Sequence, residues 1–156
     1  MLSITVRPPW SWAIAHSTKR IENRVWERPF RGALAIHAGK GWDEDGQDSP
    51  LVRQAWRDAG HDLRALTPNN AGITLGAVVA VAELVDICGA QVRPYIPSDC
   101  GCGPWAARGQ YHWKLANVRP LPEPVSCRGF QQLWTLPDDV EAAVVAQLGE
   151  QVNARG

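Results

Sequence analysis

The sequence predicts an α+β fold, a mixed β-barrel with short flanking helices, from three observations. The chain has 156 residues, 45% of them hydrophobic, which suits one compact core. Short apolar runs of strand type are separated by loops rich in glycine, proline and acidic residues. The helical segments do not look like the crossovers of βαβ units. We therefore expect a single domain over residues 1–156.

The first forty residues predict extended stretches around one short helix. Pro8 and Pro9 predict where this helix begins, because proline is tolerated in the first helical turn. Arg31 and Gly32 predict a turn before the last apolar stretch. The expected elements are a strand at Leu2–Val6, a helix at 10–17, an extended segment at 19–26 and a strand at 34–38.

The rest of the chain predicts an excursion from the barrel, two long strands and a terminal helix. Proline residues at 122 and 124 are expected to interrupt the chain between the last strands. Asp138 or Asp139 would cap the terminal helix, where a carboxylate accepts free backbone N–H groups. The expected elements are a loop-helix excursion at about 41–72 with a helix at 50–59, strands at 76–87 and 111–118, a closing strand or turn at 125–136, and a helix at 138–152.

The charge distribution excludes binding of polyanions by bulk attraction, because the formal net charge is zero. Residues 1–40 nevertheless carry seven Lys or Arg against two Glu. Any contact with nucleic acid must therefore come from a local basic patch. The alternative for these residues is an ordinary solvated face.

Neither a membrane span nor a secretory signal is expected. The longest apolar run, at 76–85, is too short to cross a bilayer and contains Glu83. Arg7, Pro8 and Pro9 interrupt the order of regions that a signal peptide requires. We expect a cytoplasmic protein.

The four cysteines are expected to be free thiols, because no secretory context supports a disulfide framework. A structural zinc site usually pairs its ligands in two knuckles with two to four residues between the cysteines. Here only Cys100 and Cys102 are close, with a single glycine between them, and Cys88 and Cys127 lie apart. The spacing predicts neither a metal site nor another cofactor.

The stretch RPPWSWAIAHSTKRIENR at 7–24 resembles the ASCH domain, named for activating signal cointegrator homology. That family's signature is a proline-tryptophan helix followed by Gly-x-Lys-x-x-Glu-x-Arg. Lys19, Glu22 and Arg24 match the pattern, and Ser17 stands where glycine is expected. Later blocks also agree: LAIHAGK at 34–40, YHWKL at 111–115 and PVSCRGFQQLW at 124–134. The resemblance implies a PUA-like barrel with a cleft that binds RNA or acts on modified nucleosides.

The resemblance makes Lys19, Glu22 and Arg24 the expected ligand-binding site. Arg24 would grip a phosphate or carboxylate through its planar fork, and Lys19 would supply a compact charge. Glu22 would accept from a base amino group or orient either cation. In an extended strand Lys19 would face away from the other two, whereas a bulge or turn at this point would bring it to Glu22; both geometries stay open. The alternative is an internal ion-pair network that braces the barrel mouth.

Other residues are candidates to complete this site. Trp10 is the preferred stacking platform for a base. Trp42 and Trp105 stand in glycine-rich loops and could form a lid. His37 ends an apolar strand just before Lys40; it either reaches the ligand with Lys40 or is a satisfied core histidine.

Binding of RNA or a nucleoside, with a single-stranded or modified base in the cleft, is the expected function. The alternative is a hydrolase, either an amidohydrolase of a modified nucleoside such as acetylcytidine or a ribonuclease. The resembling acetylcytidine hydrolases carry threonine where this chain has Glu22, and a carboxylate poorly replaces an attacking hydroxyl. Catalytic residues, if the chain is an enzyme, would be Lys19 and Glu22, with Glu22 activating water. A protein-interaction domain is the third alternative, and protein partners stay open.

Overall fold

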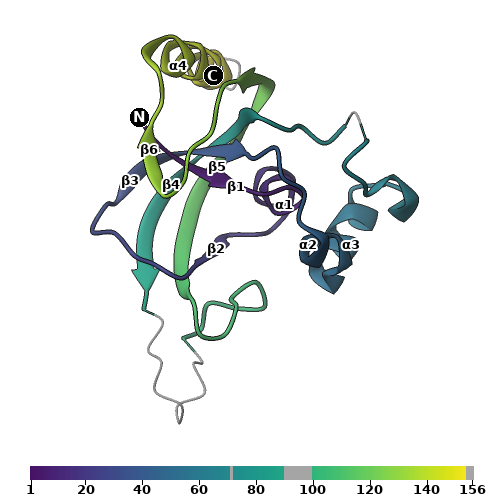
Figure 1. Ribbon diagram of the computed structural model, residues 1–156. Coiled ribbons are helices and arrows are strands. Elements are labelled where there is room, and N and C mark those ends of the chain that lie inside the picture. Colours follow the sequence, from purple (N-terminus) through teal and green to yellow (C-terminus); the bar gives the residue numbers. More distant parts are fainter. Residues whose placement is uncertain (71, 90–99, 154–156) are drawn as a thin grey trace.

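The computed structural model describes residues 1–70, 72–89 and 100–153 and forms them around one curled six-stranded sheet (Figure 1). The strand order is β2-β5-β4-β3-β1-β6, and β1 and β3 are the parallel pair. The strands are β1 Leu2–Val6, β2 Ile21–Arg24, β3 Gly32–Ala38, β4 Ala77–Cys88, β5 Tyr111–Ser126 and β6 Leu133–Thr135. The predicted mixed α+β class is confirmed, and the sheet is a half-barrel whose edges are β2 and β6.

Three helices lie close to the positions predicted at 10–17, 50–59 and 138–152, and two short helices within the 41–72 excursion were not predicted. Asp43 and Ser49 each accept a backbone N–H from the first turn of the helix that follows, and Pro50 opens the second of these helices. The helices are α1 Trp10–His16, α2 Glu44–Asp48, α3 Pro50–Asp58, the 3-10 helix η1 Leu63–Ala65 and α4 Asp138–Asn153. None of the helices in the described ranges has the length and apolar character needed to cross a bilayer.

Strand β5 is twice as long as the strand predicted at 111–118, and it continues through the prolines that were expected to break it. Its pairing with β4 explains this difference. Pro120 lies opposite Ala80, whereas the next paired residue, Val125, lies opposite Val78. Residues 121–124 therefore bulge out of the ladder, where proline costs no hydrogen bond to β4.

Three apolar clusters hold the fold together. Side chains of β3 alternate between the two faces of the sheet, so that Leu34 and Ile36 pack toward α1 while Ala35 packs toward α4. The third cluster, around Trp12 and Trp56, joins α1 to the 41–72 excursion. Helices α2 and α3 accordingly lie beside α1, away from the sheet (Figure 1).

Candidate functional site

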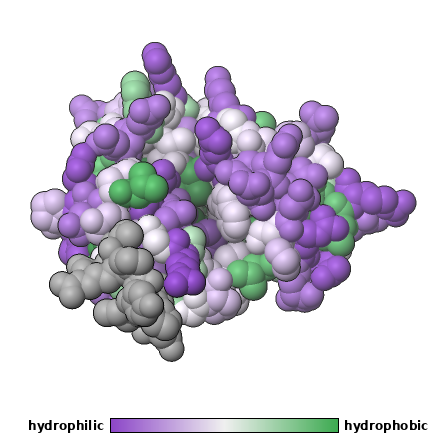
Figure 2. All heavy atoms as spheres, turned by 60° about the horizontal axis from the view of Figure 1, so that its bottom comes forward, coloured by the Kyte–Doolittle hydropathy of each residue, from purple (hydrophilic) through white to green (hydrophobic). Residues whose placement is uncertain are grey.

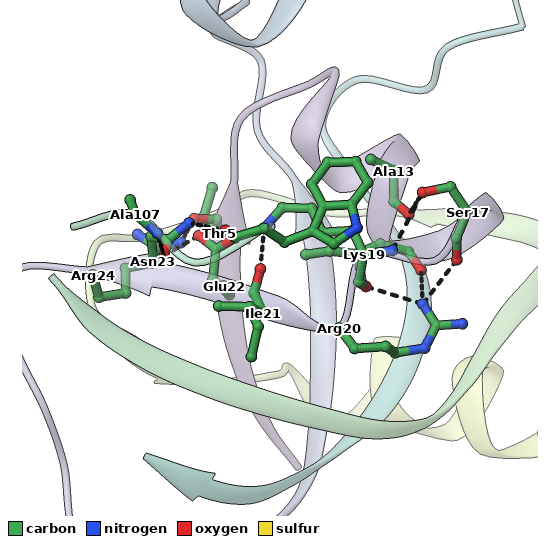
Figure 3. A network of polar contacts seen from close by, with 12 residues as sticks. Thr5, Ala13, Ser17, Lys19, Arg20, Ile21, Glu22, Asn23, Arg24 and Ala107 are labelled. Carbon is green, nitrogen blue, oxygen red and sulfur yellow. Dashed lines mark hydrogen bonds and ion pairs between the residues drawn. The ribbon is translucent and has the colours of Figure 1, made fainter. Parts of the chain in front are cut away.

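The turn between α1 and β2 positions the first residue of the candidate site. Ser17 leaves the helix in an extended conformation, and its hydroxyl donates to Ala13 O at 2.6 Å. The Arg20 guanidinium folds back and donates to Ile14 O and Ser17 O at 3.2 and 2.9 Å (Figure 3). These bonds satisfy carbonyls at the helix end, as basic side chains often do. Lys19 consequently lies before β2, outside the alternation of the strand.

Lys19, Glu22 and Arg24 form a line of opposite charges, called here the charge chain (Figure 3). Lys19 Nζ lies 3.4 Å from Glu22 Oε2 and also donates to Ile21 O. Arg24 Nε lies 3.1 Å from Glu22 Oε1 as an ion pair whose N–H is not aligned for a hydrogen bond. Arg24 Nη2 donates to Thr5 O of β1 at 2.6 Å. The Glu22 carboxylate thus neutralises part of the charge of both Lys19 and Arg24. Lys19 reaches Glu22 from the turn that precedes β2.

The charge chain is largely removed from water. Lys19 is 1% exposed and Glu22 is 8% exposed, whereas the Arg24 side chain keeps 21% of its surface exposed. Burial lowers the pKa of Lys19 because the ammonium loses its hydration, and the Arg24 charge lowers it further. The Glu22 carboxylate opposes this shift through charge and hydrogen bonding. Among the three residues of the charge chain, Arg24 is the most accessible to a ligand.

Two indole rings flank Lys19. Its Nζ atom lies 5.6 Å from the ring centroid of Trp10 and 5.8 Å from that of Trp105, within the range of cation–π attraction. Both rings are partly exposed. Trp10 is also packed against Gly46, where an added Cβ would lie 2.8 Å from Trp10 Nε1. A large aromatic surface therefore borders the buried charges.

Asn23, which the sequence analysis did not single out, holds Trp105 in this place. Its amide donates to Trp105 O at 2.9 Å, and its Oδ1 accepts from Ala107 N at 2.8 Å. Asn23 stands between Glu22 and Arg24 on β2. The sequence signal was its position inside the signature segment.

His37 and Lys40 are placed apart from the charge chain. His37 Nε2 donates to Cys127 O at 3.0 Å, and its ring lies 5.5 Å from that of Trp134 on the α4 side of the sheet. Burial lowers the pKa of His37. Lys40 is exposed, and its stem lies beside Gly76. Within the described ranges no contact links either residue to Glu22.

The two tryptophans expected in a lid differ. Trp105 lies over Lys19, as described above. Both rings pack against the third cluster, but Trp42 donates from Nε1 to Gln47 Oε1 at 2.7 Å. Only Trp105 borders the charge chain among these two.

Most of the basic residues of the first forty positions lie at the surface. Figure 2 shows a face with a hollow between two lobes, and mostly hydrophilic side chains surround it. Five of the seven Lys and Arg side chains are exposed, and the other two belong to the charge chain. The exposed five are Arg7, Arg20, Arg28, Arg31 and Lys40.

The comparisons with known proteins agree with this architecture. Solved structures of ASCH from Zymomonas mobilis share the fold: the protein itself superimposes with a TM-score of 0.54, 14% identity and coverage of 93% of each chain. A mutant form of that protein gives 0.51 at 15% identity, covering 93% of this chain and 96% of that one. No curated protein matched the sequence. The ASCH domain model matches residues 4–124, and this chain belongs to the ASCH domain family.

Proposed function

We propose that this domain binds RNA or a nucleoside at the charge chain, with a base stacked on an adjacent tryptophan. The observation that carries the proposal is the buried Lys19–Glu22 pair, which two partly exposed indole rings flank. Buried charges are expensive to keep, so a preassembled set next to open aromatic surface favours a binding site over simple bracing.

Each part of the arrangement supplies a contact that a nucleotide needs. Aromatic side chains stack on bases of any sequence, at about 1–3 kcal/mol per base. Arginine has five N–H donors, and among the described residues Thr5 and Glu22 engage two nitrogens of Arg24. Because the net charge is zero, attraction of a phosphate backbone would have to come from individual basic side chains such as Arg24. Recognition of an unstacked, single-stranded base fits these features best.

Binding of fluorescently labelled single-stranded RNA, followed by anisotropy over a series of salt concentrations, tests the proposal. Arg24→Ala should weaken binding and flatten the salt dependence by about one released counterion. Trp10→Ala should weaken binding with little change in slope, because stacking releases no counterion. Arg57→Ala is the matched control, since Arg57 lies exposed on α3 and its side chain bonds only to Gln54 among the hydrogen bonds found in the described ranges.

The control should leave both affinity and slope near those of the wild type. Unchanged binding in Arg24→Ala and Trp10→Ala, with both variants folded, would remove the site. A loss of affinity in Arg57→Ala equal to that in Arg24→Ala would reduce the interaction to general surface charge.

A hydrolase is the second candidate, and the lowered pKa of Lys19 favours it. A lysine that releases its proton more readily can serve as a general base, and Glu22 lies within reach to relay the proton. Incubation with acetylcytidine and chromatography of the products would detect this activity. Turnover by the wild type that Lys19→Met abolishes would establish the hydrolase; absence of turnover alongside measurable binding supports the binding function.

A further inference from the structure

Three cysteines and one histidine converge where β4 ends and β5 begins. Cys88 is the last residue of β4 and pairs in register with His112, the second residue of β5. Cys100 and Cys102 stand in the connection between these strands. One ligand atom from each of the four residues lies within 4.8 Å of all the others. This Cys/His cluster is separate from the charge chain.

The histidine of the cluster is oriented as a metal ligand. His112 is 3% exposed, and its Nε2 lies 2.7 Å from Ala107 O, which can only accept a hydrogen bond. In the neutral imidazole this contact places the proton on Nε2 and leaves the lone pair of Nδ1 available for a metal. Nδ1 lies 3.2 Å from Cys100 Sγ, toward the thiols. Histidines that bind metals usually donate their second N–H to a carbonyl in this way.

We infer that the Cys/His cluster binds a structural Zn²⁺ ion through three thiolates and one imidazole nitrogen. Zinc bonds of about 2.3 Å to sulfur and about 2.0–2.1 Å to nitrogen place tetrahedral ligand atoms about 3.5–3.8 Å apart. The 4.8 Å limit on the cluster leaves only small side-chain movements to reach that geometry. Soft thiolate donors with a tetrahedral arrangement select zinc over hard cations.

The inference reverses the expectation drawn from cysteine spacing. A single glycine between Cys100 and Cys102 makes a poor knuckle, but β4 and β5 supply the other two ligands through their register. Cys127 takes no part, since it packs against the cluster of side chains under α4. The spacing rule considers neighbours in the sequence, whereas antiparallel pairing of β4 with β5 brings Cys88 and His112 together here.

The metal would also restrain the segment that carries Trp105, which borders the candidate site. Trp105 and Ala107 lie between Cys102 and His112 in the chain, and both bond to Asn23. A zinc ion would fix the chain on either side of them and so hold the Trp105 ring near Lys19. This inference does not depend on what the charge chain binds.

The test is the zinc content of the untagged chain, purified under reducing conditions with Zn²⁺ present and then dialysed into metal-free buffer. Elemental analysis by mass spectrometry should find about one zinc per chain. Cys102→Ser should retain much less, and Cys127→Ser should retain as much as the wild type. Cobalt substitution should add thiolate-to-metal absorption in the wild type and in Cys127→Ser only.

Circular dichroism shows whether each variant is folded. If Cys102→Ser folds poorly, the zinc content and the cobalt spectrum of the wild type still test the inference. Removal of zinc by a chelator should lower the melting temperature of the wild type, since binding energy in such sites contributes to folding. Wild-type protein that retains no zinc, or that carries a disulfide among Cys88, Cys100 and Cys102 after reduction, would overturn the inference. Equal retention in Cys102→Ser would do the same.

Discussion

Lys19 and His37 are both buried bases beside a tryptophan, yet they lie in opposite environments. Lys19, on the α1 side, has a carboxylate 3.4 Å away and an arginine beyond it. His37, on the α4 side, has a backbone carbonyl on Nε2, while its buried Nδ1 has no hydrogen-bond partner among the described residues. Burial of a base is therefore not itself the mark of a binding site. The proposed site differs in two respects: Lys19 has a charged partner in Glu22, and Arg24 beside them is partly exposed to solvent.

The difference follows from what each side chain loses on burial. A neutral imidazole can enter the core without carrying a charge, so His37 needs no charged partner, and one of its two ring nitrogens is hydrogen-bonded. A lysine has an ordinary pKa far above neutrality and needs either a partner or a proton release. Removal of a charged partner should therefore destabilise the fold most at the charge chain. Addition of side-chain volume should destabilise it most around His37.

Removal of Glu22 should give the largest effect. Glu22→Ala leaves Lys19 and Arg24 facing each other in the interior, and loss of one partner of a buried pair costs about 3–5 kcal/mol of unfolding free energy. Urea denaturation would measure it. Asp86→Ala is the control, because Asp86 also lies between two cations, Arg31 and Lys114, but at the surface.

The control should lose far less unfolding free energy, because water and salt screen exposed ion pairs. Equal losses for Glu22→Ala and Asp86→Ala would show that burial does not make the Glu22 carboxylate more important than an exposed one. The claim that buried Lys19 needs a charged partner, whereas buried His37 does not, would then be wrong.

An added methyl group at Gly129 should break the other region by a smaller amount. A Cβ built there would lie 2.4 Å from His37 Cε1 and 2.8 Å from Thr5 Oγ1. Overpacking of this kind costs about 1–3 kcal/mol. Gly149→Ala, on α4 with open space around its Cα, should instead stabilise by about 0.5–1 kcal/mol. Thermal melts of the two variants should therefore shift in opposite directions.

RNA binding by the folded Gly129→Ala variant should match that of the wild type, because His37 does not contact the charge chain within the described ranges. A loss of affinity at full folding would connect the two regions and return His37 to the binding site.

Features that depend on local signals could be predicted from the sequence. The positions of β1, β3, β4 and the helices at 10–16, 50–58 and 138–153 followed from periodicity and start signals. Residues 19–24 followed from a compact motif whose members are close in the chain. The alternation of a strand left the geometry at Lys19 open, and the structure places Lys19 before β2. The confirmed family and fold rest on the same blocks.

Features that depend on tertiary pairing could not be predicted from the sequence. The bulge that lets β5 run through its prolines depends on its register with β4. The face on which His37 lies depends on which cluster covers it, and either side is apolar in sequence. The Cys/His cluster likewise depends on two strands meeting at their ends. In each of these cases the deciding partner is more than twenty residues away, as with His37 and Cys127.

The pH dependence of stability gives the smallest and most specific difference between the two bases. Because burial lowers the pKa of Lys19, the unfolded chain binds a proton that the folded chain lacks between the folded pKa and 10.5. Unfolding free energy should rise with pH across that window, by at most about 1.4 kcal/mol per pH unit, and level off above it. His37 should produce a similar rise only below pH 6.5, since its pKa is lowered from that value. Urea unfolding of wild type and Lys19→Met over a pH series isolates the lysine, because the variant keeps the Glu22–Arg24 pair and every other titrating group. The wild-type curve minus the variant curve should rise toward pH 10.5; a flat or falling difference would mean that Glu22 outweighs desolvation and that Lys19 stays charged in the fold.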